Sequence, residues 1–461
     1  MGRVDIVPDA VYLIIMNPLA EELNAALAGT AVERLLSDLG RRMYFPKGIL
    51  TQSAEADEKA KRFNATIGMA YSHGEPLILD AIRAGLPTLS ATEAVAYATT
   101  AGVPALRRRW KVEMEAKNPS LKGLSYSLPV VVPGLTAAIS YVADLFLGPG
   151  DSVVMPDLHW PNYRLIVEER KMAAGLTYPI FAGNEAATTG RGPGDRLPHF
   201  NVEGLEARLR EAGARRGKAC AILNFPNNPT GYTPMVEEAD AIVAALLRVA
   251  SEGTDLLVVV DDAYFGLQYE KGLLMESIFA RLAQAHARIL AVKADGPTKE
   301  DYVWGFRTGF VTFAGAGLAP HAYDALVKKL MGVIRSSVSN SSAPVQHLLL
   351  KALDAPGRAE EKARYRALLE GRYVKVRDFL ASHELPSCLS VLPFNSGYFM
   401  SFECKGISAE ALRVRLLENG IGTISIQDRY LRVAFSSVEA SQVDELYTEI
   451  CGAAATIQAG A

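Results

Sequence analysis

Cysteine is scarce in this sequence. Its 461 residues contain four cysteines, and none stands in a CxxC pair or near histidines at metal-ligand spacing. The seven histidines likewise include no HExxH pair. A disulfide-stabilised secreted domain or a zinc site would need such a pattern. We therefore expect no structural metal, and we expect reduced thiols at Cys220, Cys388, Cys404 and Cys451.

The sequence also lacks an excess of charge and a long hydrophobic run. The formal net charge is −3 and the pI is about 6.2, so no basic field exists to recruit nucleic acid or an anionic membrane. Near the N-terminus, Asn17 and Pro18 interrupt an apolar stretch that is too short for a membrane span or a signal peptide. We expect a cytoplasmic protein without a nucleic-acid or membrane partner.

Hydrophobic residues make up 49% of the sequence, which is enough for a sizeable core. Between residues 127 and 313 predicted strands and helices alternate, as is typical of a mostly parallel α/β sheet flanked by helices. The pattern also predicts helices over residues 76–86 and 161–172. A stretch rich in Gly, Thr and Pro at residues 184–197 predicts a surface excursion.

A Ser/Asn-rich break near Ser341 separates the alternating part from a C-terminal region that is predicted to be α+β. We therefore expect three parts. Residues 1–75 form an N-terminal arm with part of a small domain, residues 76–344 form the large domain, and residues 345–461 form the C-terminal small domain.

Polar and aromatic side chains follow the predicted central strands where these strands end. In an open α/β sheet the carboxyl ends of the strands form the ligand crevice. One strand leads into a helix through PGLT, where free backbone N–H groups suit a phosphate. The residues delivered to this edge are, in chain order, Gly134, Leu135, Thr136, Trp160, Asn228, Asp261, Tyr264, Lys299 and Arg307.

Lys299 and Arg307 suggest what this edge binds. A lysine amine can condense with an aldehyde and act as a covalent catalyst, and a guanidinium holds a phosphate with a planar fork of donors. Pyridoxal phosphate is an aldehyde that carries its own phosphate. Each motif alone has an ordinary interpretation: PGLT as a helix cap, Trp160 as core, NPTG as a tight turn and DDAY as a strand end. Their combination in this order favours a shared site.

Three motifs together resemble the class I/II aminotransferases of pyridoxal-phosphate fold type I, and within them the aspartate aminotransferases. These are NPTG at residues 228–231, D-x-x-Y at 261–264, and G-x-R-x-G at 305–309, whose arginine lies eight positions after Lys299. The resemblance implies a large domain with a mostly parallel sheet plus a smaller α+β domain formed by the chain ends. It also implies pyridoxal 5'-phosphate as cofactor and a homodimer with shared active sites.

The resemblance assigns roles around the cofactor. Lys299 would bind it covalently and move the substrate's α-proton, and Asp261 would pair with the pyridine nitrogen, with Tyr163 beside it. Tyr264 and Asn228 would bond the ring oxygen, and Trp160 would stack on the ring. The remaining contacts, all to the phosphate, would come from Gly134, Leu135, Thr136, Thr298, Arg307 and the other subunit's Tyr97.

One other lysine and one glycine bear on these assignments. Lys293 is a rival covalent lysine, but it lies 14 positions before Arg307 and follows no turn of small residues. Gly296 stands where the family often has a phosphate-binding serine, so Thr298 or other donors would substitute for it.

The resemblance also assigns substrate contacts. Arg432 would clamp the α-carboxylate of the substrate, and Asn395 would line the entrance. Ile67 and Gly68 would belong to a segment that closes over the substrate. Arg335 would cross the dimer interface to bind a distal carboxylate, which favours aspartate or glutamate, although aromatic-specific relatives can keep this arginine. An interface arginine paired with a structural acid is the alternative.

The expected reaction is transfer of an amino group between an L-amino acid, aspartate, glutamate or an aromatic one, and a 2-oxo acid such as 2-oxoglutarate. A lyase on the same scaffold, either a C–S β-lyase or an aspartate β-decarboxylase, remains an alternative because it would use the same residues. A regulator with an aminotransferase fold fits the sequence less well, since no basic winged-helix stretch precedes Tyr97. A dehydrogenase is also a weak alternative, because the Gly-Ala-Gly motif at residues 315–317 lacks the third glycine of a dinucleotide-binding loop.

Overall fold

The computed structural model of the chain describes residues 16–27, 49–66, 70–73, 75–183 and 199–460. The chain divides into two compact units, Met1–Lys47 and Gly48–Ala461. In the first unit the described element is helix α1, Pro18–Leu27. All other elements belong to the second unit. The excursion predicted at residues 184–197 lies outside the described residues.

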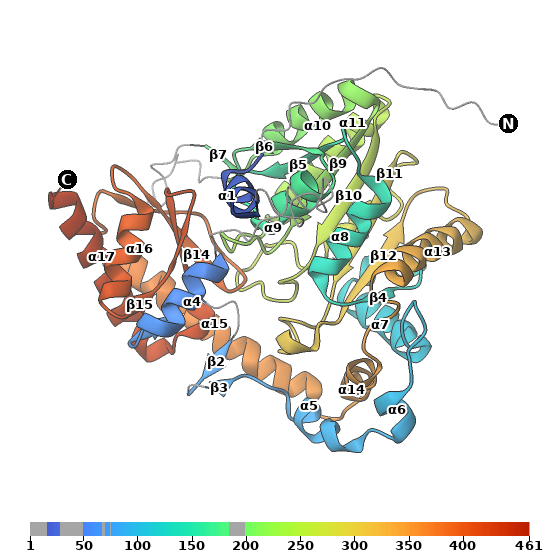
Figure 1. Cartoon of the computed structure of the whole chain (residues 1–461), viewed down its shortest axis with the longest axis horizontal. Helices are drawn as coiled ribbons and strands as arrows, with labels where there is room; N and C mark the ends of the chain where they lie inside the picture. Colours follow the sequence, from blue (N-terminus) through green and yellow to red (C-terminus); the bar gives the residue numbers. More distant parts are fainter. Residues whose placement is uncertain (1–15, 28–48, 67–69, 74, 184–198, 461) are drawn as a thin grey trace. The chain divides into compact units, whose positions relative to one another are not determined.

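A seven-stranded sheet forms the centre of the second unit (Figure 1). All neighbours are parallel except β12, which runs antiparallel to both β4 and β11. The apolar sequences of these strands fit a sheet covered on both faces. In spatial order the strands are β4 (Val130–Val132), β12 (Gly309–Ala314), β11 (Ile289–Asp295), β10 (Asp255–Asp261), β9 (Lys218–Asn224), β5 (Ser152–Pro156) and β6 (Ala174–Tyr178).

Helices cover both faces of this sheet. Helices α8 (Leu135–Phe146) and α13 (Pro320–Ser337) pack on one face, and α10 (Val202–Arg216) and α11 (Val236–Ser251) pack on the other. This is the α/β arrangement that the sequence predicts. Along β10, odd-numbered residues face α8 and even-numbered residues face α10 and α11. The alternation sends Asp261 and Asp262 to opposite sides of the sheet.

A second, antiparallel sheet lies in the C-terminal region, drawn in orange and red in Figure 1. Its strands are, in spatial order, β13 (Leu389–Val391), β14 (Phe399–Cys404), β17 (Tyr430–Ala434) and β16 (Ile424–Ile426). Three helices pack around it: α15 (Arg358–Ser382), α16 (Ala409–Glu418) and α17 (Val443–Gly460).

An N-terminal segment joins this C-terminal region. Strand β1 (Phe63–Asn64) pairs in parallel with β15 (Ile421–Gly422), and α4 (Ile49–Lys59) packs beside β15. Strands from near the two ends of this unit therefore lie side by side, although more than 350 residues separate them in sequence.

The remaining elements complete the second unit. They are β2 (Tyr71–Ser72), β3 (Glu75–Pro76), α5 (Asp80–Gly85), α6 (Ala91–Val95), α7 (Pro104–Lys117), α9 (Asn162–Arg164), β7 (Phe181–Ala182), β8 (His199–Phe200), α12 (Ile278–Leu282) and α14 (Ala343–Leu353). Within the described part of the chain, no helix has both the length and the apolar character of a membrane span.

Two helix predictions were wrong in detail. The helix predicted over residues 76–86 begins only at Asp80, because Glu75–Pro76 pair with Tyr71–Ser72 as a small hairpin. The helix predicted over residues 161–172 is a short α-helical turn followed by a π-helical segment, Leu165–Arg170. The apolar residues of this segment still face the core. The spacing of apolar residues predicts which face is buried, and that part of the prediction holds.

Candidate active site

A cavity of about 110 Å³ opens where β9, β10 and β11 end and α8 begins. Apart from Asn224 and Ala263, each lining residue is one that the sequence predicts for a shared site. The carboxyl ends of the central strands therefore do converge, as expected for this kind of sheet. The cavity is lined by Leu135, Thr136, Trp160, Asn224, Asn228, Asp261, Ala263, Tyr264, Thr298, Lys299 and Arg307.

Lys299 lies in the turn after β11, and its Nζ stands 4.9 Å from the ring centre of Tyr264. Desolvation lowers the pKa of Lys299 to about 8, Asp261 opposes this change, and Arg307 adds to it. A substantial fraction of this amine is therefore neutral near pH 8, which is the form that attacks an aldehyde. The rival Lys293 contacts Asp262 and Asp295 and does not line the cavity.

Asp261 is the last residue of β10, and two hydrogen bonds hold its carboxylate. The hydroxyl of Tyr163 donates a hydrogen bond to its Oδ2, and the amide of Ala263 donates one to its Oδ1 at 3.1 Å. Burial raises the pKa of Asp261, while Tyr163, Lys299 and the Ala263 amide oppose the rise. These partners favour a carboxylate fixed in one orientation, which can pair with a cationic ring nitrogen.

Asn224 is a lining residue that the motif analysis missed. Its Nδ2 donates to the backbone oxygen of Asp261 at 2.9 Å, and its Oδ1 accepts from the amide of Asn228 at 2.8 Å. It thereby joins the end of β10 to the loop that carries Asn228. Its position as the last residue of β9 was the available signal.

The start of α8 and the guanidinium of Arg307 form the other end of the cavity. Gly134 has φ +89°, and a Cβ there would lie 2.4 Å from Arg307 Nη2. The guanidinium therefore lies directly against the first turn of the helix, where backbone N–H groups lack partners. The buried Thr298 hydroxyl has no hydrogen-bond partner within the described structure. This donor set suits a phosphate.

Gly296 stands where the turn leaves little room for a side chain. A Cβ at this position would meet the backbone oxygen of Thr308 at 2.9 Å and Gly309 Cα at 3.1 Å. The turn packs so closely on β12 that glycine fits best there.

Arg432 on β17 is a buried cation near the cavity. It is 2% exposed, its Nη1 donates to Asn228 Oδ1 at 3.0 Å, and its Nη2 donates to the backbone oxygen of Thr66 at 3.1 Å. Burial lowers the pKa of Arg432 to about 10. Among the described residues no carboxylate pairs with this guanidinium, and its Nε has no partner. A buried, uncompensated cation is costly unless an anion joins it.

The sequence between residues 69 and 450 matches the family described as aminotransferase class I and II. The chain belongs to this family. A probable N-acetyl-LL-diaminopimelate aminotransferase of Bacillus subtilis is 25% identical over 349 residues, which cover 74% of this chain and 77% of the relative. An aspartate/prephenate aminotransferase of Thermus thermophilus is 24% identical over 415 residues, which cover 87% and 95% of the two chains.

Solved structures show the same fold. A crystal structure of an aminotransferase from Anaerococcus prevotii has a TM-score of 0.76 at 20% sequence identity, covering 88% of this chain and 96% of that one. The fold is therefore fold type I, as the motifs predict, and the protein is a transferase.

Class I and II aminotransferases use pyridoxal phosphate, and the cavity of this aminotransferase fits that cofactor. The unpartnered Thr298 hydroxyl and the guanidinium of Arg307, which lies against Gly134, form the phosphate end. Asp261 offers a buried carboxylate for the ring nitrogen, and Lys299 offers an amine of lowered pKa for the aldehyde. The phosphate, the ring nitrogen and the aldehyde of the cofactor would thus each have a residue of complementary chemistry.

Three predicted site residues of this aminotransferase, Asn395, Tyr97 and Arg335, do not line the cavity. The side-chain amide of Asn395 bonds the backbone of Thr233: its Oδ1 accepts from Thr233 N–H at 2.8 Å, and its Nδ2 donates to the Thr233 oxygen at 2.9 Å. Tyr97 is 92% exposed, and Arg335 is exposed at the end of α13 with Ser339 as its partner. Ile67 and Gly68 lie outside the described residues.

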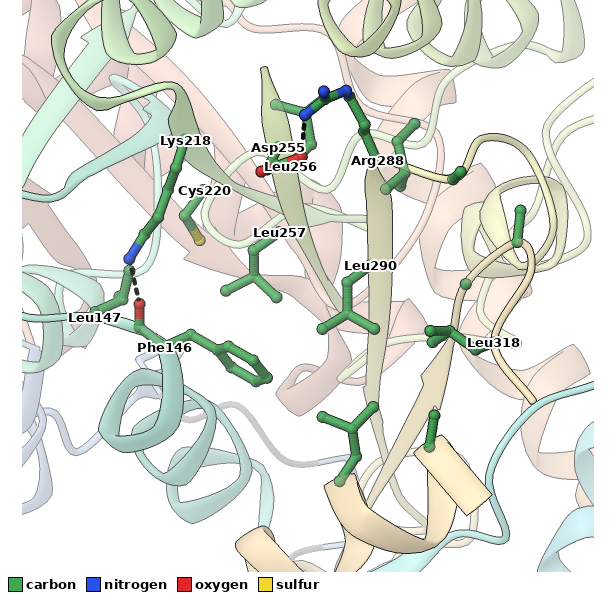
Figure 2. A pocket seen from close by; sticks show the side chains of 16 residues that line it. Phe146, Leu147, Lys218, Cys220, Asp255, Leu256, Leu257, Arg288, Leu290 and Leu318 are labelled. Atoms are coloured by element: carbon green, nitrogen blue, oxygen red, sulfur yellow. Dashed lines mark hydrogen bonds and ion pairs between the residues drawn. The ribbon is translucent and has the colours of Figure 1, made fainter. Parts of the chain in front are cut away.

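A second cavity, of about 420 Å³, lies at the amino ends of β9, β10 and β11 (Figure 2). It is lined mainly by apolar side chains such as Phe146, Leu257 and Leu290. Its cations already have partners, since Lys218 bonds the backbone oxygen of Phe146 and Arg288 pairs with Asp255. Although larger, this cavity carries none of the reactive groups of the aminotransferase site.

Proposed function

We propose that this aminotransferase moves the amino group between aspartate or glutamate and a 2-oxo acid such as 2-oxoglutarate, with aromatic amino acids as a second donor class. The observation that carries the proposal is the placement of two anion sites beside one amine. Arg307 with the start of α8 forms one, Arg432 forms the other, and Lys299 lies in the cavity. An amino acid bound at Arg432 by its α-carboxylate would present its α-carbon to Lys299.

The residues between the two anion sites support this arrangement. The ring of Tyr264, which Lys299 contacts, packs edge-on against Phe399 with ring centres 5.5 Å apart. The guanidinium carbon of Arg432 lies 4.2 Å from the ring centre of Phe399. Asn228, which lines the cavity, also accepts a hydrogen bond from Arg432. The cofactor cavity and the carboxylate site are therefore contiguous.

Pyridoxal phosphate, when bound, supplies an aldehyde that takes up the amino group and a ring that withdraws electrons from the substrate's α-carbon. In the proposed mechanism Arg432 would bind and orient the substrate carboxylate. Lys299 Nζ would hold the cofactor and would later accept the proton from the α-carbon, since its lowered pKa leaves part of the amine neutral near pH 8. Asp261, fixed by Tyr163, would keep the proton on the ring nitrogen. Trp160 and Tyr264 would exclude water from the ring.

The proposal includes a homodimer in the cytoplasm with sites shared between subunits. Tyr97 is 92% exposed and Val95, two positions earlier, is 83% exposed. Both side chains are therefore accessible to a second subunit. Arg335 is exposed as well. An arginine that reaches into a partner's site is expected to be exposed when its own chain is viewed alone. In this proposal Tyr97 contacts the partner's phosphate site and Arg335 binds the distal carboxylate of its substrate.

Absorption spectroscopy of the purified holoenzyme tests the function. L-aspartate, L-tyrosine and L-alanine are added separately without a 2-oxo acid. We expect L-aspartate to convert the yellow cofactor band to the amine form and 2-oxoglutarate to restore it. Conversion by tyrosine or alanine alone would contradict the dicarboxylate assignment. Release of alanine and carbon dioxide from L-aspartate without conversion would identify a β-decarboxylase instead, and release of pyruvate and ammonia from a cysteine thioether would identify a C–S β-lyase.

A variant sharpens the assignment of Arg335. We expect Arg335→Met to lower kcat/KM for L-aspartate about 30-fold or more, because the distal carboxylate loses its cation, with little effect on L-tyrosine. Lys329→Met, which removes another exposed cation of α13, should change neither value. Equal losses for both substrates would contradict the role of Arg335.

A further inference from the structure

Helix α7 directs two side chains at the turn that carries Lys299. Trp110 and Lys117 lie seven positions apart, so that they share one face of the helix. Trp110 is 2% exposed and stacks on Phe310 with ring centres 4.2 Å apart. The ammonium of Lys117 lies 5.2 Å from the centre of the Trp110 ring. The two side chains thus form one buried group against the sheet.

These two side chains bind the two ends of the turn. Trp110 Nε1 donates to both carboxylate oxygens of Asp295, at 3.2 and 3.3 Å, and Asp295 is the last residue of β11. Lys117 Nζ pairs with Glu300 Oε2 at 2.6 Å, and Glu300 directly follows Lys299. The four residues between the contacts, 296–299, include both Thr298 and Lys299 of the cavity. One helix face therefore fixes the turn from both sides.

The two carboxylates have further cationic partners. Lys293 Nζ lies 3.3 Å from Asp295, and Lys362 Nζ of α15 lies 3.0 Å from Glu300. Burial raises the pKa of Glu300, but Lys117 and Lys362 outweigh burial and hold it below its usual value. Glu300 is therefore a carboxylate in a mostly buried place, and its position depends on where these ammonium groups stand.

The other hydrogen bonds of the turn are made by its backbone, since the hydroxyl of Thr298 has no partner among the described residues. The backbone oxygen of Thr298 accepts from Val303 N–H at 3.1 Å, and the backbone oxygen of Lys299 accepts from Tyr302 N–H at 3.4 Å and from the hydroxyl of Tyr398 at 3.1 Å. A displacement of the turn would move the Lys299 amine directly. A misplacement of about 1 Å at a reacting group can reduce a rate about 100-fold.

We propose that Trp110 and Lys117 are positioning residues that hold the turn of Lys299 through Asp295 and Glu300. This inference rests on the proposed function, because it assumes that Lys299 is the reacting amine. Removal of either contact leaves the cofactor and substrate sites chemically intact and misplaces the amine between them.

Helix α7 also offers a matched control on its outer face. Lys111 pairs with Glu115 at 3.9 Å and lies 4.7 Å from the ring centre of Tyr126. Lys111 thus has the same kinds of partner as Lys117, an acid and an aromatic ring, but it does not contact the turn. Lys117→Met and Lys111→Met remove the same charge from the same helix.

The test compares holoenzymes and cofactor-free proteins of these variants. For Lys117→Met we expect kcat to fall about tenfold or more with the KM of the amino acid within about twofold, because Arg432 is untouched. In the cofactor-free protein, the pH profile of Lys299 labelling by trinitrobenzenesulfonate should shift to higher pH, because Glu300 loses a compensating cation. Lys117→Arg should recover most of kcat. Lys111→Met should match the wild type in all three measurements.

A double variant separates position from charge and guards against misfolding. Lys117→Met with Glu300→Gln restores the charge balance and leaves no unpaired buried carboxylate. We expect its labelling profile to return toward the wild type while kcat stays about tenfold low. Full recovery of kcat would overturn the positioning role, as would a Lys117→Met variant that behaves like Lys111→Met. A wild type that binds no pyridoxal phosphate would instead refute the proposed function.

Discussion

At the scale of single residues, the amine of Lys299 sets the expected pH dependence. Desolvation lowers its pKa to about 8, so the neutral amine becomes the main form only above that pH. We expect the rate at which the cofactor-free protein takes up pyridoxal phosphate to rise about tenfold per pH unit below pH 8 and to level off above it. Stopped-flow absorbance measures this rate.

A variant checks the cause of that profile. Asp261 raises the pKa of Lys299, so that Asp261→Asn should move the plateau to lower pH. A plateau above pH 10 in the wild type would mean an amine in an ordinary aqueous environment and would contradict the buried site.

The sequence predicted the residues whose chemistry is unusual for their surroundings. Lys299 and Asp261 follow apolar strands, and Arg307 lies between small residues, so each could be selected from the sequence. Tyr398 and Trp110 could not be selected in this way. An aromatic residue within an apolar stretch is normally core, and their contacts with the backbone oxygen of Lys299 and with Asp295 depend on packing between distant segments.

At the scale of elements, the start of α8 determines how the phosphate end is built. In Gly134→Ala the new Cβ would displace the guanidinium of Arg307 from the first turn of the helix. We expect affinity for pyridoxal phosphate to fall about tenfold or more, because a charged donor leaves the site. Fluorescence titration of the cofactor-free protein gives the affinity.

Gly123→Ala is the control for backbone strain. Gly123 has φ +82°, close to that of Gly134, but a Cβ there meets no atom within 4 Å. We expect this variant to lose about 1 kcal/mol of stability and to keep its cofactor affinity. An equal loss of affinity in both variants would show that strain, and not the position of Arg307, weakens binding.

The existence of the elements followed from the sequence better than their geometry. The apolar strands from β9 to β11 agree with the predicted pattern. The π-helical segment Leu165–Arg170 does not, because apolar spacing reports which face is buried and not the hydrogen-bond register. The pairing of β1 with β15 also escaped prediction, since two-residue strands carry no periodicity.

At the scale of the whole molecule, the roles proposed for Tyr97 and Arg335 require a second subunit. Both side chains are exposed in the single chain, so both are accessible to a partner. If sites are shared, a mixed dimer of two inactive variants must contain one complete site. We propose to mix Lys299→Ala with Arg335→Met under conditions that exchange subunits.

The mixture distinguishes shared sites from separate ones. Random exchange makes half of the dimers mixed, and each mixed dimer has one site with Lys299 from one subunit and Arg335 from the other. We therefore expect about a quarter of the wild-type activity toward L-aspartate. Lys299→Ala mixed with Asp261→Asn should recover none, because both residues line the same cavity of one chain. Absence of recovery in the first mixture, with subunit exchange confirmed by mass spectrometry, would place Arg335 in its own subunit's chemistry or outside the site.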